Sequence, residues 1–353
     1  MVITFERINE VNYNCSDIHV FMETLSGKRA SRIPYYDMEF AQTDIYELIF
    51  ERPVNKITGP MDVEFIIEAA LCTGKDIVGG TGFYTEWNQN FQVSSNGERH
   101  YVGGFVKSID DVRGKMDFPI PEESFERLEK MIKATEKTPL GVRVDLSNFL
   151  FNSYLSMGIE NFSVAIYTDP DLINYLLDNF FVWMHKIAQR LAEYPINLVF
   201  LDSDLAYATG LIFSPDWLRE KWLPKMKQIV SIFRNKDIGV IMHTDGKIEE
   251  ILPLVVEAGI QGIHPIEPAF NDITDIYKKY HGKLCLFGNI NVMGALLNGT
   301  PDDVEREVRE KIEAMNKGGY VCTTSTAGIM DGQTTVKAEN YIRMIETIHG
   351  YKH

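Results

Sequence analysis

Short apolar runs rich in β-branched residues alternate along this chain with longer segments whose apolar residues recur at helical spacing. The short runs predict strands, and the longer segments predict amphipathic helices. Seven strands are expected, at residues 75–83, 141–147, 196–204, 237–246, 260–268, 284–291 and 319–327. An eighth is expected near Ile33–Tyr36, where the pattern is ambiguous.

The same sequence pattern marks the start of two predicted helices. Ser214 precedes Pro215, and Thr300 precedes Pro301, with an aspartate following each proline. A hydroxyl at the N-cap, a proline at the first helical position and an acidic side chain in the first turn all favour a helix start. A long amphipathic helix is also expected over residues 169–194.

Strands that alternate with helices predict parallel strands joined by right-handed crossovers. An open doubly wound sheet and a closed (β/α)8 barrel both satisfy this pattern. The number of units favours the barrel, and no GxGxxG motif marks a nucleotide-binding sheet. We therefore expect a single α/β domain over residues 1–353, a (β/α)8 TIM barrel on which residues 1–70 pack as an N-terminal extension.

Charge and cysteine usage narrow the partners and the compartment. The chain has 50 acidic and 35 basic residues, a formal net charge of −15, which argues against nucleic acid and anionic membrane surfaces as partners. Its four cysteines are irregularly spaced, which indicates reduced thiols. No signal peptide and no membrane-spanning apolar run is evident, so we expect a cytoplasmic protein.

Polar side chains gather where the predicted strands end. They are Asp145, Asp202 and Asp204, His243 and Asp245, Glu267, Asn289, and Cys322. One aspartate after a strand is as readily a helix cap or a turn residue. Six predicted strands end in such polar residues, and barrel active sites lie at the carboxyl ends of the strands. The sequence therefore predicts an active site at these strand ends.

Two of these residues suggest a metal. His243 and Asp245 are two positions apart on one strand and face the same side. With Cys322 they would give zinc three ligands and leave a fourth position open. The alternative is a hydrogen-bonded His–Asp pair, with Cys322 packed as a small apolar residue.

Two further candidates could contact a substrate. Tyr84 lies in the aromatic segment Phe83–Trp87, which is either a lid over a flat substrate or ordinary surface packing. Arg143 either binds a substrate carboxylate or pairs structurally with Asp145, which points to the same side of its strand.

Several motifs resemble the central block of the uroporphyrinogen-decarboxylase-like superfamily over roughly residues 140 to 349. They include His243-Thr244-Asp245-Gly246, Pro265-Ile266-Glu267-Pro268, Gly288-Asn289-Ile290 and Gly318-Gly319-Tyr320. The resemblance implies a (β/α)8 barrel. True decarboxylases of the superfamily carry an N-terminal arginine motif that Ser31–Tyr36 lacks, which argues against porphyrinogen decarboxylation.

The resemblance is nearest to the corrinoid-dependent zinc methyltransferases. Those that act on coenzyme M carry a His-x-Cys pair and a later cysteine. His243 matches the histidine, Cys322 falls in the position of the later cysteine, and Asp245 replaces the middle cysteine. The resemblance thus implies zinc held by His243, Asp245 and Cys322, and a corrinoid supplied by a partner protein.

We therefore expect a zinc-dependent methyltransferase that moves a methyl group between a small donor, such as a methoxylated aromatic, and a corrinoid protein. Asp202, Asp204 and Glu267 are the expected catalytic groups, and Arg143, Asp145, Tyr84 and Asn289 the expected substrate-binding groups. Two alternatives remain: a metal-free decarboxylase or lyase of a small carboxylated substrate, and a non-catalytic barrel that binds a tetrapyrrole or corrinoid.

Overall fold

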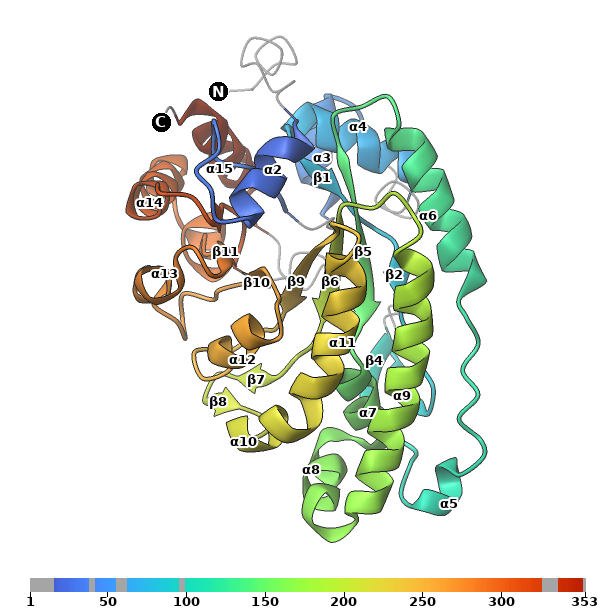
Figure 1. Cartoon of the computed structure of the whole chain (residues 1–353). Coiled ribbons are helices and arrows are strands. Elements are labelled where there is room, and N and C mark those ends of the chain that lie inside the picture. Colours follow the sequence, from blue (N-terminus) through green and yellow to red (C-terminus); the bar gives the residue numbers. More distant parts are fainter. Residues whose placement is uncertain (1–15, 38–41, 55–61, 95–98, 326–335, 352–353) are drawn as a thin grey trace.

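Parallel strands at the centre of the molecule are surrounded by helices in a computed structural model that describes residues 16–37, 42–54, 62–94, 99–325 and 336–351 (Figure 1). The central strands are β1 (Ile77–Val78), β2 (Gly82–Phe83), β5 (Gly141–Ser147), β6 (Leu198–Asp202), β9 (Gly239–His243), β10 (Gly262–His264), β11 (Cys285–Phe287) and β12 (Tyr320–Val321). Two small hairpins, β3 (Gln89–Val93) with β4 (Arg99–Gly104) and β7 (Ala206–Tyr207) with β8 (Gly210–Leu211), stand apart from them.

Some helices precede β1, and the others lie between and after the later strands. They are α2 (Ile18–Leu25), α3 (Thr43–Phe50), α4 (Val63–Thr73), α5 (Ile109–Val112), α6 (Glu122–Thr135), α7 (Phe149–Met157), α8 (Ile159–Thr168), α9 (Pro170–Leu191), α10 (Pro215–Trp217), α11 (Leu223–Arg234), α12 (Leu252–Glu257), α13 (Ile273–Tyr280), α14 (Pro301–Ala314) and α15 (Ala338–Gly350). Two π-helical turns, η2 (Leu218–Trp222) and η3 (Val292–Leu296), complete the set.

The predicted helix starts are confirmed. The Ser214 hydroxyl accepts a hydrogen bond from the Trp217 amide, and Thr300 forms a capping box with Asp303. The Asp169 carboxylate accepts from the Leu172 amide at the start of α9. These side chains satisfy amide donors that the first turn of a helix leaves without partners.

The sheet runs β1–β5–β6–β9–β10–β11–β12, all parallel, and β2 continues the line of β1 beside β5. The segment at residues 33–37 lies between the two ends of this sheet. Tyr35 bridges Cys322 in parallel, and the Asp76 amide donates to the Tyr35 carbonyl at 3.0 Å. Seven of the predicted strands are thus confirmed in a (β/α)8 barrel, the first of them as the two short strands β1 and β2. At the eighth position Tyr35 forms a single bridge, so residues 33–37, which we expected in the extension, lie in the barrel wall without forming a regular strand.

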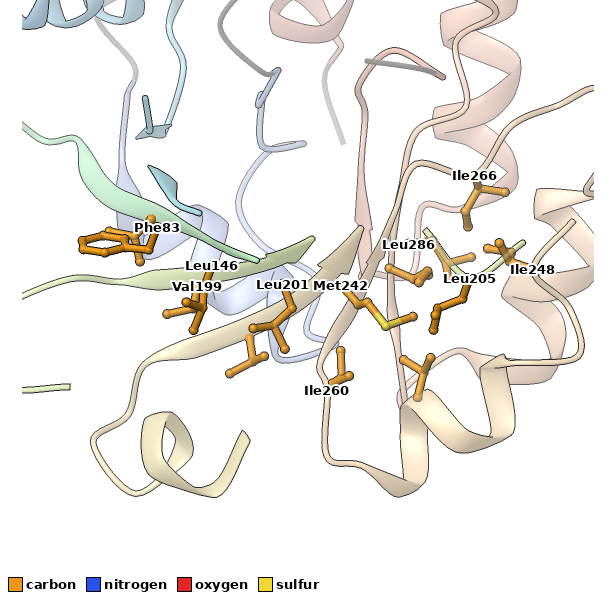
Figure 2. Packing of buried hydrophobic residues seen from close by; sticks show 14 of the residues in the cluster. Phe83, Leu146, Val199, Leu201, Leu205, Met242, Ile248, Ile260, Ile266 and Leu286 are labelled. Carbon is orange, nitrogen blue, oxygen red and sulfur yellow. The ribbon is translucent and has the colours of Figure 1, made fainter. Parts of the chain in front are cut away.

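Alternate strand residues face two separate apolar layers. Inside the barrel, Phe200, Ile241 and Val321 pack with Phe21 and Leu25 of α2. Outside, the residues between them on each strand pack against the surrounding helices. Figure 2 shows part of this outer layer, with Leu146, Val199, Leu201, Met242 and Leu286 projecting from their strands.

Helix α2 closes one end of the barrel (Figure 1). The first residues of two strands, Gly141 and Gly239, lie against it. A Cβ atom at Gly141 would lie 2.2 Å from Ile18 Cδ1, and one at Gly239 would lie 2.7 Å from Leu25 Cδ2. Helix α2 thus covers the amino-terminal ends of the strands, opposite the ends where the predicted site residues lie. None of the helices in the described segments is both long enough and apolar enough to cross a membrane.

Candidate active site and metal centre

The central site residues lie at the ends of the neighbouring strands β6 and β9. Asp202 and His243 are register partners at the carboxyl ends of these strands, and Asp204 and Asp245 follow each of them by two residues. The Ser203 amide donates to the His243 carbonyl at 3.0 Å, and the Leu205 amide donates to the Thr244 hydroxyl at 2.9 Å. These bonds tie the two loops together beyond the strand ends.

Asp204, His243 and Asp245 form a cluster that could hold a metal ion, with one candidate ligand atom of each lying within 4.8 Å of the others. His243 Nε2 lies 3.9 Å from Asp204 Oδ1 and 3.9 Å from Asp245 Oδ1. Both carboxylate atoms are buried, and neither has a hydrogen-bond partner among the described residues. An imidazole nitrogen facing two unsatisfied carboxylate oxygens fits zinc or a similar divalent ion.

The other nitrogen of His243 faces a second histidine. His243 Nδ1 lies 2.9 Å from His264 Nδ1, on the adjacent strand β10. His264 is 1% exposed, and its ring packs edge-on against Phe200, Tyr36 and Phe287. Burial, with the neighbouring His243, holds the pKa of His264 well below its usual value, so this ring is neutral. His264 therefore orients His243 and leaves its Nε2 directed at the two carboxylates.

Charge in the cluster favours a cation. Burial lowers the pKa of His243, but the carboxylates of Asp245, Asp204, Asp202 and Asp145 raise it more, so that the pKa lies above its usual value. Burial raises the pKa of Asp245 and of Glu267. A bound divalent ion would stabilise the ionised carboxylates in place of a proton.

Arg143 and Asp145 form a buried ion pair on β5. Arg143 Nη1 donates to Asp145 Oδ1 at 2.6 Å, and the Arg143 side chain is 1% exposed. Its guanidinium carbon lies 4.9 Å from the centre of the Phe200 ring. Gly79 gives it room, since a Cβ atom there would lie 2.2 Å from Arg143 Nη2. Of the two roles considered for Arg143, the structure shows the pairing with Asp145.

Tyr84 reaches the same end of the barrel from the loop after β2. Its hydroxyl donates a hydrogen bond to Asp202 Oδ2, and the side chain is half-exposed. Burial raises the pKa of Asp202 above its usual value, although His243 and the Tyr84 hydroxyl act in the opposite direction. Tyr84 and Asp202 thus lie at the boundary between the cluster and solvent.

Glu267 and Asn289 stabilise the neighbouring loops. Glu267 Oε2 accepts a hydrogen bond of 2.6 Å from the amide of Gly246, the residue after Asp245. Asn289 donates to the Ile266 carbonyl at 2.7 Å. Its Oδ1 atom is buried and has no hydrogen-bond partner among the described residues.

Cys322 does not join the cluster. It follows Val321, which faces the barrel interior, and itself belongs to the outer layer between strands and helices. Burial raises the pKa of its thiol to about 12. The structure therefore differs from the sequence-predicted set of His243, Asp245 and Cys322: Asp204, expected as a catalytic group, lies with His243 and Asp245 instead. The i, i+2 spacing of Asp202 and Asp204, which matches that of His243 and Asp245, was the signal available for Asp204.

Comparisons with known proteins agree with this architecture. The family model described as Uroporphyrinogen decarboxylase (URO-D) matches residues 107–351. Two curated relatives are methylcobamide:CoM methyltransferases MtbA, from Methanosarcina acetivorans (21% identical) and Methanosarcina mazei (22% identical). Each match covers 53% of this chain and 52% of the relative, so the chain spans about half the length of these relatives.

A solved structure has a similar fold over most of its length. It is that of a methyltransferase from Methanosarcina mazei, with a TM-score of 0.69 and 14% sequence identity. The similarity covers 93% of this chain and 96% of that one. At this identity it shows that the two proteins share a fold.

Proposed function

The chain belongs to the uroporphyrinogen decarboxylase family, and we propose that it is a zinc-dependent methyltransferase acting between a small methyl donor and a corrinoid protein. The observation that carries the proposal is the cluster of Asp204, His243 and Asp245, with its two unsatisfied carboxylate oxygens. The curated relatives, which are methylcobamide:CoM methyltransferases, support the reaction class.

The donor set favours an oxygen-containing substrate. Two carboxylates and one imidazole are harder ligands than thiolates and leave the metal a stronger Lewis acid. Bound zinc would supply polarisation of an ether oxygen and stabilisation of the phenolate that leaves it. A methoxylated aromatic is therefore the proposed donor, with the reduced cobalt of a corrinoid partner as the methyl acceptor.

Residues of this chain would orient the methyl donor and supply the proton that the departing phenolate takes up. As the methyl–oxygen bond breaks and the methyl–cobalt bond forms, both electrons of the broken bond stay on oxygen. Asp202 and Tyr84, which are hydrogen-bonded to each other, would orient the donor and deliver a proton to the phenolate. Glu267 holds the loop that carries Asp245 through the Gly246 amide.

Metal content and methyl transfer test the proposal together. Protein purified without chelator is expected to contain near-stoichiometric zinc by mass spectrometry and to methylate reduced cobalamin when given a methoxyaromatic. His243→Ala and Asp204→Asn are expected to lose the metal, whereas Cys322→Ala and the exposed-site control His281→Ala keep it. Full methyl transfer after exhaustive chelation would contradict the zinc dependence, and zinc-loaded protein that forms no methylcobalamin would contradict the methyltransferase.

A further inference from the structure

The end of the barrel that carries the site residues is rich in negative charge. Asp204 and Asp245 each approach His243 Nε2 at 3.9 Å, and Asp202 is the register partner of His243. Glu267 accepts a hydrogen bond from the Gly246 amide, next to Asp245, and Asp145 lies on the neighbouring strand β5. Among the described residues, Arg143 lies beside them as a basic side chain and pairs with Asp145. The acidic side chains at this end thus outnumber Arg143, and their oxygen atoms are acceptors, so an anionic group entering here would meet repulsion.

Arg143 is not placed to offset that repulsion. Its guanidinium is already bound to Asp145 at 2.6 Å, and its side chain is almost fully buried. The guanidinium carbon of Arg143 lies 4.9 Å from the centre of the Phe200 ring and 5.5 Å from the centre of the Tyr36 ring. Moving Arg143 to a substrate carboxylate would leave Asp145 as a buried charge without its ion-pair partner, which is strongly unfavourable.

Unsatisfied acceptor atoms also lie in this part of the barrel. Asn289 is 1% exposed, and its Oδ1 atom has no hydrogen-bond partner among the described residues. The Oδ1 atoms of Asp204 and Asp245 also lack such a partner, but they are the atoms proposed to hold the metal, so Asn289 Oδ1 remains as an acceptor for a ligand. The Tyr84 hydroxyl, by contrast, already donates to Asp202. A ligand that brings a hydroxyl donor satisfies such acceptors, whereas a carboxylate brings more acceptors.

We propose that the methyl donor is an uncharged methoxyphenol rather than a methoxybenzoate. The inference rests on the proposed function and defines its substrate class. The free phenolic hydroxyl donates to a carboxylate or to Asn289 Oδ1, and the half-exposed ring of Tyr84 provides an aromatic surface at the entrance. The carboxylates at the strand ends exclude donors that carry a negative charge.

The test compares two donors that share one methoxyphenol ring: vanillyl alcohol, which is neutral, and vanillate, which is anionic. Binding is followed by intrinsic fluorescence of the zinc-loaded protein, and methyl transfer is followed by the absorbance of methylcobalamin. We expect the alcohol to bind and react at least about tenfold better at low ionic strength, and added salt to narrow the gap.

A variant identifies the source of the selectivity. Asp145→Asn removes one carboxylate and weakens its pairing with Arg143, so it is expected to improve vanillate relative to the alcohol by about tenfold or more. Glu313→Gln, an exposed acidic position on α14, is the matched control and leaves the ratio unchanged. Should Asp145→Asn fail to fold, the wild-type ratio and its salt dependence decide the question.

The outcomes separate this inference from the proposed function. Vanillate that binds as tightly as the alcohol overturns the inference, whether or not methyl transfer is observed, and so does failure of both donors to bind. Selective binding of the alcohol without any methylcobalamin supports the substrate class and contradicts the methyltransferase.

Discussion

His243 and His264 face each other across β9 and β10 with their Nδ1 atoms 2.9 Å apart. One ring nitrogen of His243 is thereby engaged, and the other is left for Asp204, Asp245 and a metal. Groups that hydrogen-bond the free ring nitrogen of a metal-bound histidine fix its tautomer and its orientation, and their loss typically costs about 10–100-fold in metal affinity or activity.

Replacing His264 should therefore weaken metal binding without removing a ligand. His264→Phe keeps the aromatic packing against Phe200 but loses the nitrogen, and we expect zinc affinity to fall by about tenfold or more. His264→Asn, whose side-chain oxygen can replace Nδ1 as an acceptor, should recover part of the loss. Competition with a chromogenic chelator measures both, and equal affinities in all three proteins would contradict the orienting role.

The stability of the metal-free protein should fall as pH rises through the pKa of His243. Burial lowers that pKa, but the surrounding carboxylates raise it above its usual value. The folded state therefore holds the proton more tightly than the unfolded state, which stabilises the fold fully below about pH 6.5 and is lost as pH increases through the folded-state pKa.

The measurement is the difference in melting temperature between the chelated wild type and chelated His243→Gln, from about pH 5 to pH 9. The difference isolates this group from others that titrate, such as His349, whose pKa burial lowers to about 4. Zinc should reverse the trend, since its ligands bind in their deprotonated forms. If the melting temperature of the chelated wild type rises relative to that of chelated His243→Gln as pH increases, the pKa of His243 is not raised in the folded state.

Gly79→Ala should displace the buried Arg143. The added Cβ atom would lie 2.2 Å from Arg143 Nη2, a position that the guanidinium cannot leave without disturbing Asp145. We expect a loss of about 1–3 kcal/mol in the free energy of unfolding, measured by urea denaturation. Gly350→Ala, at the end of α15 with no heavy atom within 4 Å of its added Cβ, is the control and should be near neutral.

Tyr84→Phe should impair methyl transfer while leaving the metal in place. The substitution removes the hydroxyl that donates to Asp202, and it leaves Asp204, His243 and Asp245 unchanged. We expect kcat/KM for the donor to fall by about tenfold and the zinc content to stay the same. Tyr101→Phe, which removes a hydroxyl bonded to the Leu155 carbonyl, is the matched control, and an equal fall there would point to a general structural effect.

Local sequence determined the elements of this fold. Alternating strands and helices, together with caps such as Ser214 and Thr300, predicted the barrel and a site at its strand ends. This was possible because the periodicity of apolar residues and the hydrogen bonding of helix-end amides depend on only a few neighbouring residues. The resemblance in the block around His243 pointed to the family that the chain belongs to.

Only the tertiary structure decided which side chains meet. Neighbouring strand residues face opposite layers, so Val321 points into the barrel and Cys322 points outward. The sequence did not show which of the two faces inward, because the run around them is apolar and lacks an alternation of polar and apolar residues. The approach of Asp204 to His243, and of His264 to its other nitrogen, depends on the register between separate strands. That register is set by the packing of the whole barrel, to which residues far apart in the chain contribute, and a local pattern does not contain it.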